Sequence, residues 1–118
     1  MGRIPEYIEQ AQKSGIQHLA VTDHGVMYAA YDFYKQVTKA GLHPIVGMEA
    51  YFADGKAGPP PPDASEAERK ARRKSYHLLL LAENETGYRN LMKLASNASL
   101  HGYYYRPRID IDMLAQHK

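Results

Sequence analysis

Apolar runs of strand length alternate with segments of helical spacing along this chain, and this alternation limits its fold more than any other feature. The helical spacing of apolar side chains predicts helices at about 5–15, 27–40, 85–100 and 111–116. Short apolar runs predict strands at 17–22, 44–52 and 76–82. Elements in this order, joined mostly by short connections, are typical of an α/β fold in which helices cover a sheet of parallel strands. Asp110 is placed to cap the last helix.

One segment, at about 53–75, interrupts the alternation and is interpreted as a mobile surface insertion. It contains a proline run at 59–62, which favours a stiff and extended chain, and a polar, helix-prone stretch at 65–74. The stretch carries a basic cluster that could contact a nucleic-acid backbone, formed by Arg69, Lys70, Arg72, Arg73 and Lys74. Such a run is more often a solvated face, and neighbouring glutamates offset part of its charge.

The sharpest local motif is Thr22-Asp23-His24-Gly25, at the carboxyl end of the first predicted strand. Active sites of α/β folds lie at that end of the sheet. A carboxylate beside an imidazole suits a zinc, manganese or iron ion. The alternative is that Asp23 caps the following helix while His24 is solvated, and the motif alone leaves both interpretations open.

Two further candidates lie on the next two predicted strands. Glu49 is inside an otherwise apolar strand, and a buried carboxylate is costly unless it is paired or metal-bound. It could instead face water or pair with a basic residue. His77 is at the start of its Leu-rich strand rather than at the end, and a lone His there is more often a core residue than a ligand. Convergence of these residues with Asp23 and His24 predicts a divalent-cation site of the phosphoesterase type.

Composition narrows the chemistry of any such site. The chain has no Cys, so disulfides and thiolate metal sites are excluded, and this absence fits a cytoplasmic protein. No apolar run reaches the ~18 residues of a membrane span. A net charge of +2 neither requires nor excludes nucleic acid as a partner. The 118 residues are too few for a polymerase or for a closed eight-stranded barrel, which needs roughly 200.

Five segments in the same order resemble the PHP (polymerase and histidinol phosphatase) domain family. They are 16–25 with 31–34, 41–51, 76–82, 84–94 and 102–110. The last two are similar to the PHP domain of the bacterial DNA polymerase III alpha subunit rather than to a free-standing phosphatase. The resemblance covers nearly all of residues 1–118 except the Pro-rich insertion.

The resemblance implies that residues 1–118 are part of a distorted (β/α)7, TIM-like barrel with metal bound at one mouth. It places metal ligands at Asp23, His24, Glu49 and His77. Complete sites in the family also use ligands that would precede and follow this sequence. At most about half of the site is therefore expected here, and the activity of this part alone is expected to be weak or absent. Complete sites are linked to metal-dependent 3′–5′ exonuclease or phosphoesterase activity, whereas many polymerase members keep the domain for structure.

The resemblance also implies a parent protein that is a DNA polymerase, a nucleotidyltransferase that uses magnesium. Its implied partners are DNA and other replisome subunits, including the proofreading exonuclease, with no membrane partner. Two alternatives stay open: a free-standing phosphoesterase of the histidinol-phosphate phosphatase type, and a non-catalytic interaction module of the replisome. Because part of a barrel exposes strand edges and an apolar face, the isolated chain is expected to self-associate or to be marginally stable.

Overall fold

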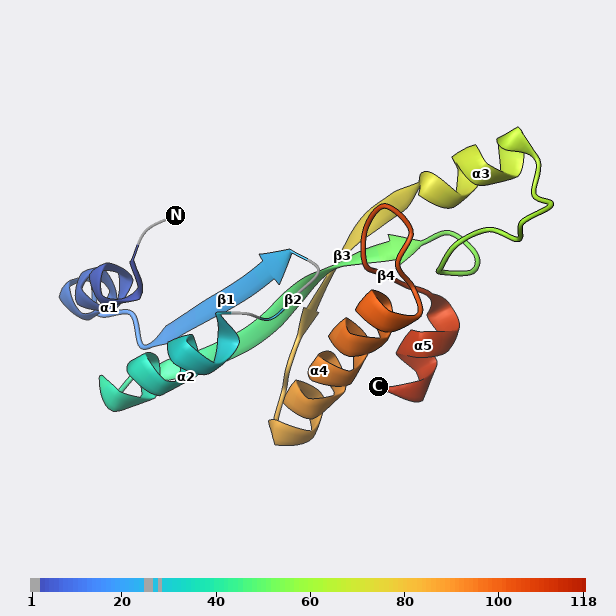
Figure 1. The fold of residues 1–118 in the computed structure, drawn as a ribbon. Coiled ribbons are helices and arrows are strands. Elements are labelled where there is room, and N and C mark those ends of the chain that lie inside the picture. The colour runs from blue at the N-terminus through green and yellow to red at the C-terminus, as the bar shows by residue number, and fades with distance from the viewer. Residues whose placement is uncertain (1–2, 25–26, 28) are drawn as a thin grey trace.

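The computed structural model describes residues 3–24, 27 and 29–118, and it contains one sheet with helices α2 and α4 on the same face (Figure 1). The helices are α1 (Ile4–Lys13), α2 (Ala30–Lys39), α3 (Glu66–Arg73), α4 (Glu85–Leu100) and α5 (Ile111–Gln116). The strands are β1 (His18–His24), β2 (His43–Ala53), β3 (Ser75–Leu81) and β4 (Arg108–Ile109). Gly25, in the predicted turn after the first strand, lies outside the described residues.

Local sequence signals set the ends of several helices. The side chain of Asn84 accepts a hydrogen bond from the Gly87 N–H at the start of α4. Asp110 was predicted to cap the last helix, and this is confirmed, because its Oδ1 accepts a 2.9 Å hydrogen bond from the Met113 N–H. Gly15 follows α1 with a φ of +73°, a left-handed conformation that favours glycine. In the described part of the chain, no helix combines the length and apolar character needed to cross a membrane.

The sheet is mixed rather than wholly parallel. Strand β2 pairs in parallel with β1 and, near its carboxyl end, with the short β4. Strand β3 pairs with β2 in the antiparallel direction, so the prediction of parallel strands is wrong for this element. The reason is the course of the chain between them: α3 extends past the end of the sheet instead of crossing its face (Figure 1). The chain therefore re-enters the sheet at the end where it left, as in a long hairpin.

Alternate residues of the strands pack against the helices on the covered face. Met48 and Ala50 of β2 are buried against α4, in a cluster with Leu91 and Leu94. A second cluster forms where α1 and α2 meet β1, and its buried members are Ile8, Phe33 and Val37. Each fully buried aliphatic or aromatic side chain contributes about 1.5–3 kcal/mol. These clusters fix which face of β2 looks inward, and so turn Glu49 to the other face.

The opposite face of the sheet is open. Leu79 and Leu81 of β3 point to it and are 56% and 54% exposed. The strands do not close into a barrel: β1 and β3 are the outer strands of the β1-β2-β3 order. The radius of gyration is 16.8 Å, compared with about 13.5 Å for a compact domain of this length. The described residues thus form an open α/β layer with one uncovered face.

Candidate metal centre

Three of the four predicted ligands converge on the open face of the sheet, and each comes from a different strand. Glu49 of the central strand β2 is paired in register with His24, the last residue of β1. His77 of β3 is paired with Tyr51, two residues beyond Glu49 and therefore on the same face. The parallel pairing places the carboxyl end of β1 beside Glu49, inside β2, which continues to Ala53. Sites in such sheets are found at the carboxyl ends of strands.

The carboxylate of Glu49 lies between the two imidazoles. Its Oε2 is 3.1 Å from Nδ1 of His24, and its Oε1 is 2.7 Å from Nδ1 of His77. One ligand atom from each of the three residues lies within 4.8 Å of the others. The Glu49 side chain is 29% exposed, against 66% and 54% for the two His side chains. The acidic group is thus the sheltered centre of the site, and the imidazoles form its rim.

The antiparallel direction of β3 explains why a residue at the start of a strand reaches the site. In a parallel sheet the amino end of β3 would lie at the far end from His24 and Glu49. In the observed pairing, the start of β3 lies beside the carboxyl end of β2. His77 therefore joins the site because β3 is antiparallel, a direction that the alternation of helices and strands did not predict.

Asp23 is placed differently from the other three. Its register partner is Met48, a core residue on the covered face, and its Oδ2 accepts a 3.0 Å hydrogen bond from the Ala29 N–H just before α2. This contact agrees with the alternative interpretation, in which Asp23 supports the start of the following helix. Asp23 is not part of the three-residue cluster, and its role as a ligand stays a prediction.

The basic cluster in α3 and after it is largely engaged by the chain itself. Arg72 donates hydrogen bonds to the carbonyls of Lys56 and Gly58, and Arg69 donates to the carbonyl of Pro62. The Arg73 guanidinium lies 5.2 Å from the centre of the Tyr105 ring. Nucleic-acid contact by these residues stays a prediction, and it would compete with these internal contacts.

Two residues near the site were not singled out from the sequence. The ring of Tyr51 lies 5.5 Å from that of His77, and the Arg106 guanidinium lies 4.9 Å from the centre of the Tyr51 ring. Such a cation–π contact holds a positive charge on the flank of the site. Tyr51 is two residues after Glu49 in the same strand, so the sequence could have placed it on the same face as Glu49. No pattern in the sequence predicts its contact with Arg106.

The donor set fits a divalent cation of intermediate hardness. Two imidazoles and one carboxylate suit zinc, manganese or iron better than calcium or magnesium. Three protein donors with exposed imidazoles leave positions for water or substrate, as in catalytic rather than structural sites. The two Nδ1 atoms already face the carboxylate, so little movement would be needed to share a cation.

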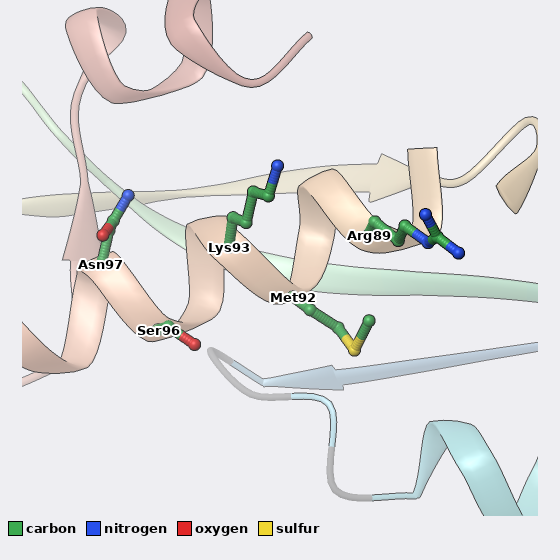
Figure 2. Close-up of a pocket in the computed structure, with 5 residues that line it drawn as sticks. All are labelled: Arg89, Met92, Lys93, Ser96 and Asn97. Carbon is green, nitrogen blue, oxygen red and sulfur yellow. The ribbon is translucent and has the colours of Figure 1, made fainter. Parts of the chain in front are cut away.

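A separate shallow groove of about 450 Å³ runs along the outer side of α4 (Figure 2). It is lined by Arg89, Met92, Lys93, Ser96 and Asn97. None of the predicted ligands contributes to it. Within the groove, Arg89 forms an exposed ion pair with Glu85 at 3.0 Å. The metal cluster and this groove are therefore different features of the molecule.

Comparison with known proteins identifies relatives along almost the whole chain. The PHP domain family matches residues 1–118. The DNA polymerase III subunit alpha of Chlamydia pneumoniae is 44% identical over 117 residues, which are 99% of this chain and 9% of that protein. The subunits of the same name from Borreliella burgdorferi and Aquifex aeolicus are 45% and 36% identical, each over 98% of this chain and 10% of the relative. The chain thus spans about a tenth of the length of these relatives.

Proposed function

The chain belongs to the PHP domain family, and on this premise we propose that it forms part of the alpha subunit of a bacterial DNA polymerase III. The support is the name shared by relatives that are 36–45% identical across nearly all of its length. The nucleotidyltransferase activity, with its magnesium ions, would reside in other parts of the longer protein. DNA and replisome subunits, including the proofreading exonuclease, would be its partners, and the cytoplasm its location.

Within that subunit, the function proposed for these residues is to hold a divalent cation for phosphoesterase or 3′–5′ exonuclease chemistry. The observation that carries this proposal is the convergence of His24, Glu49 and His77 on one face of the sheet. A bound cation supplies Lewis-acid chemistry: it activates water and offsets charge on a phosphate ester. Glu49 brings the negative charge that attracts the cation, and the two imidazoles bring neutral nitrogen donors. Arg106, fixed over Tyr51, offers a positive charge to a phosphate group.

The fold proposed for the longer protein is a distorted (β/α)7 barrel to which this sheet contributes strands. The support is the open face, which carries the exposed Leu79 and Leu81 beside the metal cluster, and the position of β1 and β3 as outer strands. Additional strands pairing with these edges would cover the face and bring further donors to the cation. The three residues described here are expected to bind a cation weakly on their own.

The cation proposal is tested by titrating the chain with zinc and with manganese in a calorimeter. One weak site per chain, lost when His24 or His77 is replaced by Ala, is the expected result. Binding that is unchanged in both variants would refute it. If the longer protein binds no cation and still assembles with its replisome partners, the domain is a non-catalytic interaction module.

Replacing Asp23 by Asn is expected to change cation affinity by less than a few-fold. The Asn side-chain oxygen can still accept the hydrogen bond from the Ala29 N–H, and the residue lies outside the cluster. The measurement is the same calorimetric titration, run beside the wild-type chain. A loss as large as that of His24→Ala would instead establish Asp23 as a ligand.

The isolated chain is expected to self-associate through its open face, and replacing Leu79 and Leu81 together by Gln should shift it toward monomer. Both side chains are more than half exposed on a continuous sheet surface, so their burial between chains is favourable. Sedimentation velocity at several concentrations measures the shift. Replacing Leu100, which is 74% exposed at the end of α4, by Gln is the matched control. A wild-type chain that is a single monomeric species with one sharp thermal transition would contradict the expectation.

A further inference from the structure

Arg108 is the largest fully buried side chain of the described residues, with 2% exposure, and it has no acidic partner among them. Its guanidinium donates hydrogen bonds to three consecutive main-chain carbonyls. They belong to Arg72, to Arg73 at 2.6 Å and to Lys74 at 2.8 Å. These carbonyls are at the carboxyl end of α3, where α3 leads into β3. Arg108 therefore reaches across from β4 to the end of the insertion.

The contact is physically specific to arginine. A buried charge costs several kcal/mol unless it is compensated, and the last carbonyls of a helix carry the partial negative charge that can compensate it. The planar guanidinium directs several N–H donors in a fixed fork, so one side chain can reach three adjacent oxygens. Burial lowers the pKa of Arg108 below its ordinary value, with the charge of Arg106 as a smaller cause, yet an arginine at this depth stays protonated at neutral pH.

The leucine pattern of the strand that follows, β3, does not by itself determine its register. In β3 the side chains of Leu78 and Leu80 face the helices, while those of Leu79 and Leu81 face the open side. A shift by one residue would exchange the two pairs and still place leucine on both faces. Register in a hairpin is otherwise fixed by the apolar pattern and by a tight turn, and a long proline-containing insertion provides no tight turn. The same shift would carry His77 to the covered face.

We propose that Arg108 is a positioning residue that fixes the register of β3 and so delivers His77 to the metal centre. Arg108 and His77 lie on opposite sides of the same residue, since both are paired with Tyr51 of β2. Holding Lys74 to β4 fixes the chain three residues before His77. Two further contacts hold the other end of the insertion: Asp110 accepts from the Ala57 N–H, and Arg72 donates to Lys56. The consequence for the cation rests on the proposed function of His77, whereas the consequence for register does not.

Register can be measured directly, because the chain has no cysteine of its own. Ala53 and Ser75 are paired in the observed register, so the double variant Ala53→Cys with Ser75→Cys should form a disulfide on mild oxidation. The double variant Ala53→Cys with Tyr76→Cys reports a register shifted by one residue. With Arg108 present, the first pair should form far more disulfide than the second. Adding Arg108→Met, which keeps the apolar stem and removes the donors, should raise the shifted product several-fold.

The matched control is Ile109→Val, a buried neighbour in β4 that belongs to the core cluster formed with α4. It should leave both disulfide yields unchanged. Cation affinity should fall about tenfold in Arg108→Met, which is within the range for residues that support a metal ligand, and should stay within twofold in Ile109→Val.

If Arg108→Met does not fold, a second variant is Arg108→Lys, which keeps the positive charge but loses the planar fork of donors. It should give intermediate disulfide yields and an intermediate cation affinity. Unchanged register and affinity in either folded Arg108 variant would overturn the proposal. A wild-type chain without cation binding would refute the proposed function, and the disulfide yields would still decide the role of Arg108.

Discussion

Replacing Glu49 by Gln should reduce zinc and manganese affinity by at least about 100-fold, or on the order of 3 kcal/mol. The physical reason is its position, because both imidazoles of the cluster contact its carboxylate and it is the only acid in the cluster. An amide carries no charge, and its NH₂ group would direct donors at the site. Since residues that only support a ligand cost about 10- to 100-fold, loss of the central ligand should cost at least as much. Calorimetric titration of the two proteins measures the difference.

The matched control for this variant is Glu85→Gln. Glu85 is an exposed glutamate at the start of α4 that pairs with Arg89 at 3.0 Å and is not a member of the cluster. The same chemical change there should leave the affinity within twofold. Far-ultraviolet circular dichroism should show both variants folded, because neither side chain is part of the buried core. Equal affinities for Glu49→Gln and the wild-type chain would remove Glu49 from the site.

Replacing Gly102 by Ala should destabilise the fold by about 3 kcal/mol, the upper part of the range for overpacking. Gly102 follows His101, the C-cap residue of α4, where the chain turns toward β4. A Cβ atom there would overlap the main-chain oxygen of Arg108 and would be 3.2 Å from the oxygen of Ala98. Both neighbours are main-chain atoms, so relief requires α4 and β4 to move apart. Urea denaturation followed by circular dichroism measures the loss.

Gly87→Ala is the control for the second variant. Gly87 is inside α4, and a Cβ atom there would make only an ordinary 3.4 Å contact with Ala82. Alanine in a helix should raise the free energy of unfolding by roughly 0.5–1 kcal/mol. A Gly102→Ala protein as stable as the wild type would contradict the close packing of α4 on β4, and with it the placement of Arg108.

The helices and strands were predictable where local patterns determine them. The helical spacing at about 27–40 predicted α2, whose buried residues include Phe33 and Val37. The position of Asp110 before the last predicted helix predicted its cap. The first two strands were expected to be neighbours because strands joined by a helix lie side by side and parallel in an α/β sheet. His24 and Glu49 were therefore predictable as neighbours, and their in-register pairing agrees.

The direction of β3 could not be predicted in the same way. Its leucines occupy both faces, so the pattern does not distinguish the two directions or adjacent registers. In the structure the chain just before β3 is held by contacts that join Arg108 to Arg72, Arg73 and Lys74, which are more than 30 residues away in the sequence. A buried arginine without an acidic partner leaves no signal in composition or spacing. Asp23 is separated from the cluster because consecutive strand residues point to opposite faces of the sheet, so Asp23 and His24 face opposite ways. The motif Thr22-Asp23-His24-Gly25 does not show which of the two faces the site.

The most direct test of the proposed cation site is diffraction from crystals of the chain soaked in zinc, with data collected at the zinc absorption edge. The predicted result is one anomalous peak about 2.0–2.2 Å from ring nitrogens of His24 and His77 and a carboxylate oxygen of Glu49. An ordered zinc ion bound elsewhere on the chain, with these three side chains free of metal, would contradict the account.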